Sequence, residues 1–533
     1  MKNLKGLPAR TLKILAGAVL IAGLLVWLVS YLIEGPLRRH MEKGINESLK
    51  GYSVELREVD FQPIGLSVTL KDLVVRQDAY PDPPVAKFPY LHAHVHWRAV
   101  LNGRLVAEFD LREPRLHINL EQLRAEAESE VPVEERGWQE AAMAIYPLRI
   151  NLLSVENGDL VYIDQDPERP LHLGGISLQA ANIRNVRSPE GTYPSPFSFE
   201  SKVFETGRAT VSGSADFLAD PHPGVEAQMT LEQVELDYFK PVLARYNVWI
   251  SEGVFSAAGR VEYSPEVKVV HLTRVEADKL LVDYVHAAET AQREEERVET
   301  TKEAAKEVSN EPGTLLRIDE LRLRGQLGMV NQATDPAYRL FVDDLDFRLA
   351  NLSNQFSHGE AKASLSGAFM GSGATEVTAT FRPETRGPDF DLNFKIEGTR
   401  LAAMNDLLRV YGNFDVVAGT FSLYSELRVK NDQVEGYLKP LFEDLDVYDK
   451  RQDEEKSAFR KMYEGLVGGV LNLLKNQPRE QVATRADIAG EVENPEASTW
   501  KIIVRLVQNA FFRAILPGFE REVSPDRNET SGG

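Results

Sequence analysis

Apolar and polar residues alternate with a period of two along most of this chain. Because successive side chains of a strand point to opposite faces of a sheet, the alternation predicts β-strands with one apolar face. Two such stretches, residues 225–231 and 390–396, correspond to each other position by position. Their apolar residues are Val225, Ala227, Met229 and Leu231 in the first stretch and Phe390, Leu392, Phe394 and Ile396 in the second.

These stretches open a longer unit that occurs twice, at 225–263 and 390–427. Each predicted strand leads into a short segment with helical spacing that ends in a tyrosine, and Tyr411 follows Tyr246 at an offset of 165 (411 − 246). A repeated strand–helix–strand unit predicts a stacked, elongated sheet rather than separate enzyme domains. In the glycine-led strand that closes each unit, Gly253, Phe255 and Ser256 correspond to Gly419, Phe421 and Ser422.

The same alternation recurs at close intervals between residues 66 and 381, and it gives roughly two dozen predicted strands without a long helix between them. A parallel, doubly wound sheet needs helical crossovers, so the pattern excludes that fold. Two polar segments, 121–139 and 287–311, interrupt the strands with dense charge and few apolar residues. We interpret the second as an inserted surface loop rather than a regulatory segment that binds a partner.

The N-terminal region contains one long apolar run, residues 14–33, without a charged residue. At about 1.5 Å of rise per residue, a helix of this length spans a bilayer core of roughly 30 Å. A cleaved signal peptide is the alternative, but its apolar region would be shorter and would end at a small-residue cleavage site. The run therefore predicts a retained membrane anchor, whose residues include Ile14, Leu20, Leu24, Trp27 and Ile33.

Basic residues before the anchor favour a cytoplasmic N-terminus, with the remaining chain of about 500 residues on the other side of the membrane. Residues 35–50 then have the spacing of a short juxtamembrane helix. Near the C-terminus, residues 454–475 and 500–516 predict two amphipathic helices. We interpret the second as a cover for the open end of the sheet, with a helix lying in a membrane interface as the alternative.

These elements divide the chain into seven parts. They are a cytoplasmic N-terminus (1–13), the transmembrane anchor (14–33), the juxtamembrane helix (34–50), a first part of the β body (51–286), a charged insert (287–312), a second part of the β body (313–450) and the C-terminal helices with the last strands (451–533).

The composition argues against several functions. With 81 acidic and 61 basic residues, the net charge of −20 disfavours a nucleic-acid partner. The chain has no cysteine, which removes thiol catalysis and thiolate metal sites. No nucleotide-binding loop, nucleophile elbow or zinc-protease motif is present, so we expect neither an enzyme nor a cofactor. A hydrolase without a recognisable site is the least supported alternative.

Three alternating histidines, His92, His94 and His96, are the arrangement that most suggests a metal; two acidic clusters, 343–346 and 443–446, lack the glycine turn and distal glutamate of a calcium loop. On a strand they would share one face at intervals of about 7 Å. The opposite face would then carry Leu91, Val95 and Trp97, so an ordinary outward polar face explains the histidines without a metal, and we predict none.

Several motifs are similar to those of a known family. Residues 49–54 running into 66–73, the two copies of the repeat, and residues 436–442 and 509–518 resemble the AsmA-like envelope proteins of Gram-negative bacteria, in a branch of undefined function. The resemblance covers nearly the whole chain. It implies an inner-membrane anchor, a periplasmic body built as a curved, groove-shaped β-sheet, and a part in moving phospholipid toward the outer membrane. Bridge-like lipid transfer proteins share this architecture.

The fold class we expect is therefore mainly β: an elongated, curved antiparallel sheet forming a groove, with short helices. The apolar trough of such a sheet would suit acyl chains, since burial is worth about 0.8 kcal/mol per CH₂. We expect an inner-membrane protein with its bulk in the periplasm, whose partners are phospholipid or another acyl-chain lipid, the inner membrane and outer-membrane components. A non-catalytic scaffold for outer-membrane proteins is the alternative. The candidate groove residues are Leu91, Val95, Trp97, Val225, Ala227, Met229, Leu231, Phe255, Phe390, Leu392, Phe394, Ile396, Phe421 and Leu423.

Overall fold

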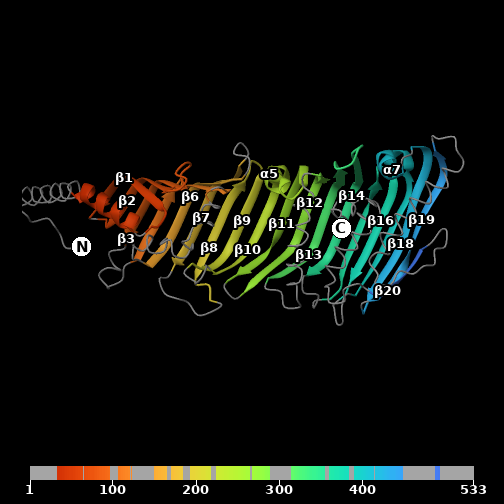
Figure 1. The fold of residues 1–533 in the computed structure, drawn as a ribbon. Helices are drawn as coiled ribbons and strands as arrows, with labels where there is room; N and C mark the ends of the chain where they lie inside the picture. Colours follow the sequence, from red (N-terminus) through yellow and green to blue (C-terminus); the bar gives the residue numbers. More distant parts are fainter. Residues whose placement is uncertain are drawn as a thin grey trace, which may run out of the picture. The chain divides into compact units, whose positions relative to one another are not determined.

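A computed structural model confirms the mainly β fold class, and twenty strands lie in the part of the chain that it describes (Figure 1). The structure describes residues 33–447 and 486–491, with gaps at 48, 64, 96–105, 121, 123–148, 165–169, 184–191, 218–223, 265–266, 289–313, 354–358, 383–388, 413–414 and 432. The predicted C-terminal helices and most of the charged insert lie outside the described residues. So does the anchor, apart from Ile33.

The chain forms two compact units. Unit 1 contains residues 1–230 and 262–267, and unit 2 contains residues 231–261 and 268–533. The division passes through β10 (Gly224–Glu235) and β11 (Val248–Tyr263), whereas the sequence placed its division of the β body at the charged insert.

Unit 1 is built on an antiparallel-rich sheet. Its strands are β1 (Tyr52–Gln62), β2 (Ser67–Gln77), β3 (Ala86–Val95), β4 (Val106–Arg112), β5 (Arg115–Asn119), β6 (Arg149–Ile163), β7 (Leu171–Ile183), β8 (Ser195–Val203) and β9 (Gly207–Asp216). Strands β1, β2 and β3 pair antiparallel in chain order, and β3 continues to both β4 and β5. Strand β6 runs parallel to β4 and β5, after which β6 to β9 are again antiparallel.

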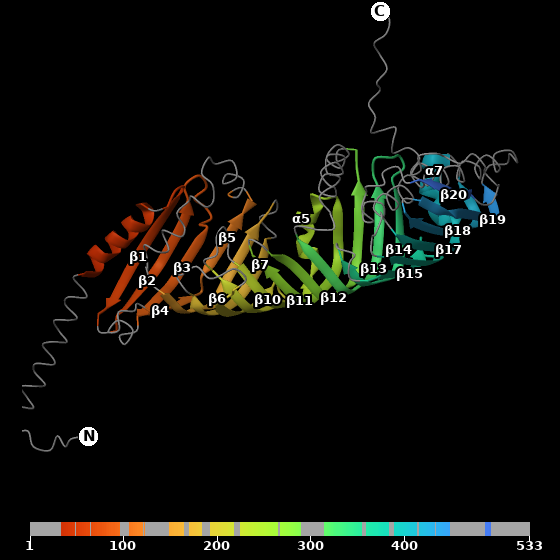
Figure 2. The ribbon, with the colours of Figure 1, turned by 90° about the horizontal axis from the view of Figure 1, so that it is seen from below.

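Unit 2 has a second antiparallel-rich set of strands. They are β12 (Lys268–His286), β13 (Leu315–Asn331), β14 (Tyr338–Ser353), β15 (Ala361–Phe369), β16 (Gly373–Phe381), β17 (Phe390–Arg400), β18 (Val416–Lys430), β19 (Gln433–Val447) and β20 (Ala486–Glu491). From β13 to β20 each strand pairs antiparallel with the next. Figure 2 shows β13 to β19 curving around the side on which the short helix α7 lies.

The sheet is antiparallel-rich, as expected, but neighbouring strands run parallel at two places. Strand β6 is parallel to β4 and β5, and β13 is parallel to β12. A parallel pair needs a long connection that returns the chain to the starting end of the first strand. The two polar segments noted in the sequence are these connections, between residues 119 and 149 and between 286 and 315. The charged insert therefore lies in the connection between two parallel neighbours in the sheet, β12 and β13.

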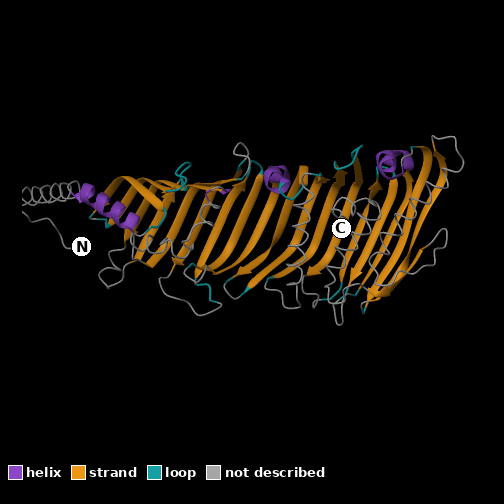
Figure 3. Cartoon of the chain, viewed as in Figure 1, coloured by secondary structure: helices purple, strands orange, loops and turns teal. Residues whose placement is uncertain are grey.

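A helix over residues 33–47 packs against the first strands of unit 1 (Figure 3). We call it the N-terminal helix. Leu37, Met41 and Ile45 of the helix, together with Leu49 just beyond it, pack in one cluster with β1, β2 and β3. Among them, Ile45 is 3% exposed. This core fixes the helix to the sheet.

Polar contacts attach the same helix to the backbone of β1. The Asn46 side chain donates to the Val54 carbonyl at 2.9 Å and accepts from the Val54 N–H at 2.7 Å. Arg38 donates to the Leu56 carbonyl at 2.9 Å. Since β2 is the strand paired with β1 in the described residues, these side chains occupy backbone groups on the opposite side of β1.

The repeated unit is confirmed as a repeat of structure. After β10 come η2 (Leu236–Phe239), α5 (Lys240–Ala244) and β11, and after β17 come η4 (Leu401–Met404), α7 (Asn405–Gly412) and β18. The two copies differ in burial. Neither η2 nor α5 contains a buried residue, whereas Leu401, Met404, Leu407 and Leu408 of η4–α7 are buried.

A matching bulge explains the repeated serines. Gln233 in β10 and Gly398 in β17, which are 165 residues apart (398 − 233), both have a positive φ, +53° and +71°. At Gly398 the pairing of β17 with β18 shifts register, which leaves an N–H to be satisfied. The Gln233 N–H donates to Ser256 Oγ and the Gly398 N–H donates to Ser422 Oγ, each at 3.1 Å. The serine of the repeat therefore accepts from the bulge of the preceding strand.

Replacing Ser422 by alanine is expected to lower the free energy of unfolding of unit 2 by about 1 kcal/mol, because the Gly398 N–H loses its acceptor. Urea unfolding of the variant and its parent measures the change. Ser364→Ala, which removes an exposed hydroxyl on β15, is the matched control and should be neutral. An S422A stability equal to that of the parent would show that water replaces the hydroxyl without cost.

Candidate functional site

Strand register joins the apolar residues of unit 1 into continuous rows that cross the strands. Leu70 faces Leu91, and Leu91 faces Leu111, so side chains on one face of the sheet meet their neighbours directly. We call this face the unit 1 apolar face. One row contains Val59, Leu70, Leu91, Leu111, Val155, Leu178, Phe199 and Val211. A second contains Val54, Val75, Ala86, Leu116, Leu160, Leu173 and Val203.

The opposite face of unit 1 is polar along a matching row. His92 lies on this face, where its Nδ1 is 2.9 Å from Thr69 Oγ1 and its ring stacks on Tyr90. The row contains Asp60, Thr69, His92, Asp110, Ser154, Gln179, Ser198 and Ser212. His94 is on the same face and His96 lies outside the described residues. Across the described part of the chain, no group of three or more histidines and carboxylates could hold a metal ion.

Unit 2 has an equivalent surface, the unit 2 apolar face. Leu365 of β15 faces Val377 of β16, which in turn faces Phe394 of β17. The row contains Phe347, Leu365, Val377, Phe394, Ser425 and Leu438. The next row contains Leu349, Ala363, Ala379, Leu392, Leu427 and Gly436.

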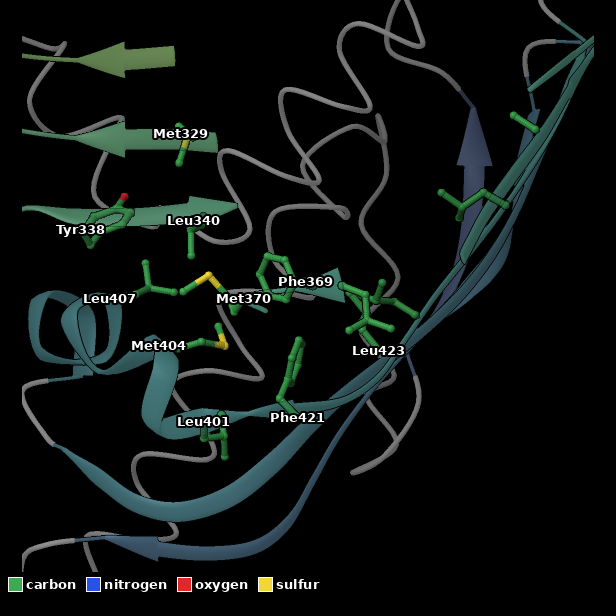
Figure 4. Close-up of a cluster of buried hydrophobic side chains, with 14 of the residues drawn as sticks. Met329, Tyr338, Leu340, Phe369, Met370, Leu401, Met404, Leu407, Phe421 and Leu423 are labelled. Carbon is green, nitrogen blue, oxygen red and sulfur yellow. The ribbon is translucent and has the colours of Figure 1, made fainter. Parts of the chain in front are cut away.

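One rim of the unit 2 apolar face is closed by side chains. Figure 4 shows Met404 and Leu407 of the η4–α7 segment pointing toward Met370, Phe369 and Phe421. Phe369 is 2% exposed. Toward the middle of the face, Leu365, Val377 and Phe394 are only half-buried. The face is therefore packed at the helical rim and partly open to solvent at its centre.

The structure separates the candidate residues into two groups by burial. Leu91, Val95, Val225, Met229, Leu231, Phe255, Leu392 and Phe394 are half-buried. Ala227, Phe390, Ile396, Phe421 and Leu423 are buried, the last four in the core cluster of unit 2. Phe255 packs beside the η2–α5 segment. Trp97 lies outside the described residues, as do the anchor residues Ile14, Leu20, Leu24 and Trp27, while Ile33 begins the N-terminal helix and is 40% exposed.

Sequence reasoning missed most of the half-buried residues that the rows bring together. In unit 1 these include Leu111, Val155, Leu178, Phe199 and Val211. In unit 2 they include Phe347, Leu365 and Val377. Each sits in a stretch of alternating residues, so its strand could be predicted. Which residues face one another depends on register, for which a single sequence carries no signal.

Ion pairs stabilise the polar face of unit 2. The guanidinium groups of Arg348 and Arg322 donate to Asp346 Oδ2 at 2.7 Å and 2.8 Å, and they hold the pKa of this carboxyl well below its ordinary value. Burial acts to raise the pKa of Asp391, but hydrogen bonds from Arg382 and Arg428 outweigh it and the pKa is lowered. Both carboxylates are satisfied by these arginines, which indicates a structural role.

Acid is expected to weaken unit 2 through Asp346. Because its pKa is lowered by folding, the ion pairs contribute fully above the unfolded value of about 3.9, and the contribution is lost as pH falls toward the folded pKa. Asp346→Asn should therefore show a smaller loss of unfolding free energy than the parent between about pH 6 and pH 3. Urea unfolding at both pH values tests this, with the exposed Asp344→Asn as control. Parallel losses in parent and D346N would contradict it.

The fold and these faces define a class of protein: a mainly β chain with curved, antiparallel-rich sheets that are apolar on one face and polar on the other. Protein-family models give no match to the chain, and no curated protein matches it. Within the described residues, no helix is both long enough and apolar enough to cross a membrane.

Proposed function

We propose that this chain is a non-catalytic lipid-binding protein of the bacterial cell envelope, anchored in the inner membrane by residues 14–33. Its two apolar faces line grooves that hold phospholipid acyl chains during transfer toward the outer membrane. The observation that carries the proposal is the half-buried state of the apolar rows. In a closed core these side chains would be fully buried, as Phe369 is.

The energetics favour a lipid that is held yet can move. Full burial of a CH₂ group is worth about 0.8 kcal/mol, so covering one side of a sixteen-carbon chain contributes about 6 kcal/mol. Adjacent strands present similar side chains at each position of a row, such as Leu365, Val377 and Phe394. Displacement by one strand therefore replaces one set of apolar contacts with another of similar strength. The resemblance to AsmA-like proteins supports the same assignment.

Photocrosslinking tests the proposal in the full chain. A photoreactive phenylalanine analogue is placed at Leu365 on the unit 2 apolar face, or at Ser364 on the polar face next to it, and lipid adducts are measured by mass spectrometry after irradiation of whole cells. We expect about tenfold more adduct at position 365, corresponding to about 1.4 kcal/mol of preference. Equal labelling at both positions would overturn the lipid assignment and favour the alternative, a non-catalytic scaffold.

A further inference from the structure

The first row of the unit 1 apolar face changes from closed to partly open along its length. Val59 on β1 and Leu70 on β2 are 3% and 0% exposed. From β3 onward every member of the row is only half-buried, including Val155, Leu178 and Phe199.

The second row changes one strand later. Its members on β1, β2 and β3 are Val54, Val75 and Ala86, which are at most 8% exposed. The next member, Leu116 on β5, is 39% exposed, and Ile118 on the same strand is 37% exposed. Both rows are closed on β1 and β2, and both have partly exposed members beyond β3, at Leu111 on β4 in the first row and at Leu116 on β5 in the second. This points to a single cover over the first strands.

That cover is the N-terminal helix. Ile45 and Leu49 are packed in one cluster with Val54, Leu70 and Leu73. The Asn46 contacts to Val54 and the Arg38 contact to Leu56 hold the helix at β1. Three hydrogen bonds and the buried apolar cluster attach the helix to unit 1.

The chain that precedes the helix indicates what lies beside this surface. The apolar run 14–33 ends at Ile33, the first described residue of the helix. If that run crosses a bilayer, the helix and the first strands lie next to the membrane surface. The apolar molecules available there in quantity are membrane lipids.

We propose that unit 1 contains a first lipid-binding position on β6 to β9, formed by Val155, Leu178, Phe199 and Val211, and that the N-terminal helix excludes lipid from β1 to β3. The inference rests on the proposed function. The four residues are separated by three strand spacings of about 4.8 Å, roughly 14 Å along the row, so one extended sixteen-carbon acyl chain is long enough to contact all of them.

An acyl chain suits this surface better than a protein segment does. The row carries no polar side chain from β1 to β9. A peptide laid along it would bury backbone N–H and C=O groups without partners, at a cost of about 1–3 kcal/mol each. A hydrocarbon chain has no such groups to satisfy.

Three aromatic positions allow a matched test in the full-length protein. The photoreactive phenylalanine analogue replaces Phe199 in the open part of the row, Phe88 in the part packed with the helix-covered cluster, or Tyr90 on the polar face. The protein is reconstituted in vesicles of phosphatidylethanolamine and phosphatidylglycerol and irradiated, and lipid adducts are quantified by mass spectrometry. Phe197, half-buried in the neighbouring row, provides a second open position.

We expect labelling at Phe199 and Phe197 to exceed that at Phe88 and Tyr90 by about tenfold. Labelling at Phe88 as strong as at Phe199 would overturn the exclusion by the helix. Labelling at Leu365 of unit 2 with none at Phe199 or Phe197 would contradict the lipid-binding position proposed in unit 1. The proposed function of the whole chain would be unaffected by that result. Absence of adducts at all of these positions would overturn the proposed function itself.

Discussion

Replacing Phe369 by alanine is expected to lower the free energy of unfolding of unit 2 by about 3–5 kcal/mol. Phe369 is 2% exposed and lies among Met370, Leu401 and Phe421 in the largest core cluster, so its removal leaves a cavity that the surrounding strands cannot fill. Urea unfolding followed by circular dichroism measures the loss.

Phe347→Ala is the matched control for this prediction. Phe347 lies on the same apolar face but is only half-buried, so its loss should cost about 1–2 kcal/mol, close to the transfer free energy of the part of the side chain that is buried. Equal losses for the two variants would show that the centre of the face is packed as tightly as its helical rim, which would remove the basis for a lipid there.

A charge at the centre of the unit 2 apolar face is expected to abolish lipid binding there. Phe394→Glu places a carboxylate in the row that contains Leu365 and Val377. An acyl chain on this row would bury the charge without a partner, at a cost of several kcal/mol. We therefore expect lipid adducts at a photoreactive residue 365 to fall by about tenfold or more.

The neighbouring Asn393 offers a control with the same added charge. It is exposed on the polar face of the same strand, where a carboxylate stays in water. Asn393→Glu should leave the adducts at residue 365 unchanged, and both variants should be checked for an intact circular dichroism spectrum. Adducts in the Phe394→Glu variant at the level of the parent would argue against an acyl chain on this face.

The strands themselves were predictable because one apolar face leaves a period of two in the sequence. Alternation at 225–231 and 390–396 marked β10 and β17, and the offset of 165 residues marked the repeat. Residues 486–491 form β20, within the C-terminal part for which the sequence predicted the last strands. These patterns involve residues that are close in sequence, so they can be recognised in a single sequence.

The parallel pairs were not predictable in the same way. Strand direction leaves no trace in the alternation, so β12 and β13 read like any antiparallel neighbours. The relevant evidence was the length of the segment between them, 28 residues from 287 to 314, which is far longer than a hairpin loop.

The exposed fractions of the candidate residues could not be predicted from their residue types. Phe390 and Phe394 have the same side chain and lie four residues apart on one face of β17, yet Phe390 is 1% exposed and Phe394 is half-buried. The difference comes from neighbours: Phe390 contacts the ring of Phe381 and faces Val429, near the end of the strand. Such contacts depend on how strands from distant parts of the sequence meet.

The contact between Asn46 and β1 also bears on how molecules of this kind avoid sticking to each other. A long strand at the margin of a sheet can recruit a strand from a second molecule through its unused backbone groups, and repeated recruitment leads to fibres. Asn46 occupies both backbone groups of Val54, and Arg38 occupies the carbonyl of Leu56. One helix thus makes this margin a poor template for polymerisation, in a chain whose repeated sheet architecture would otherwise invite it.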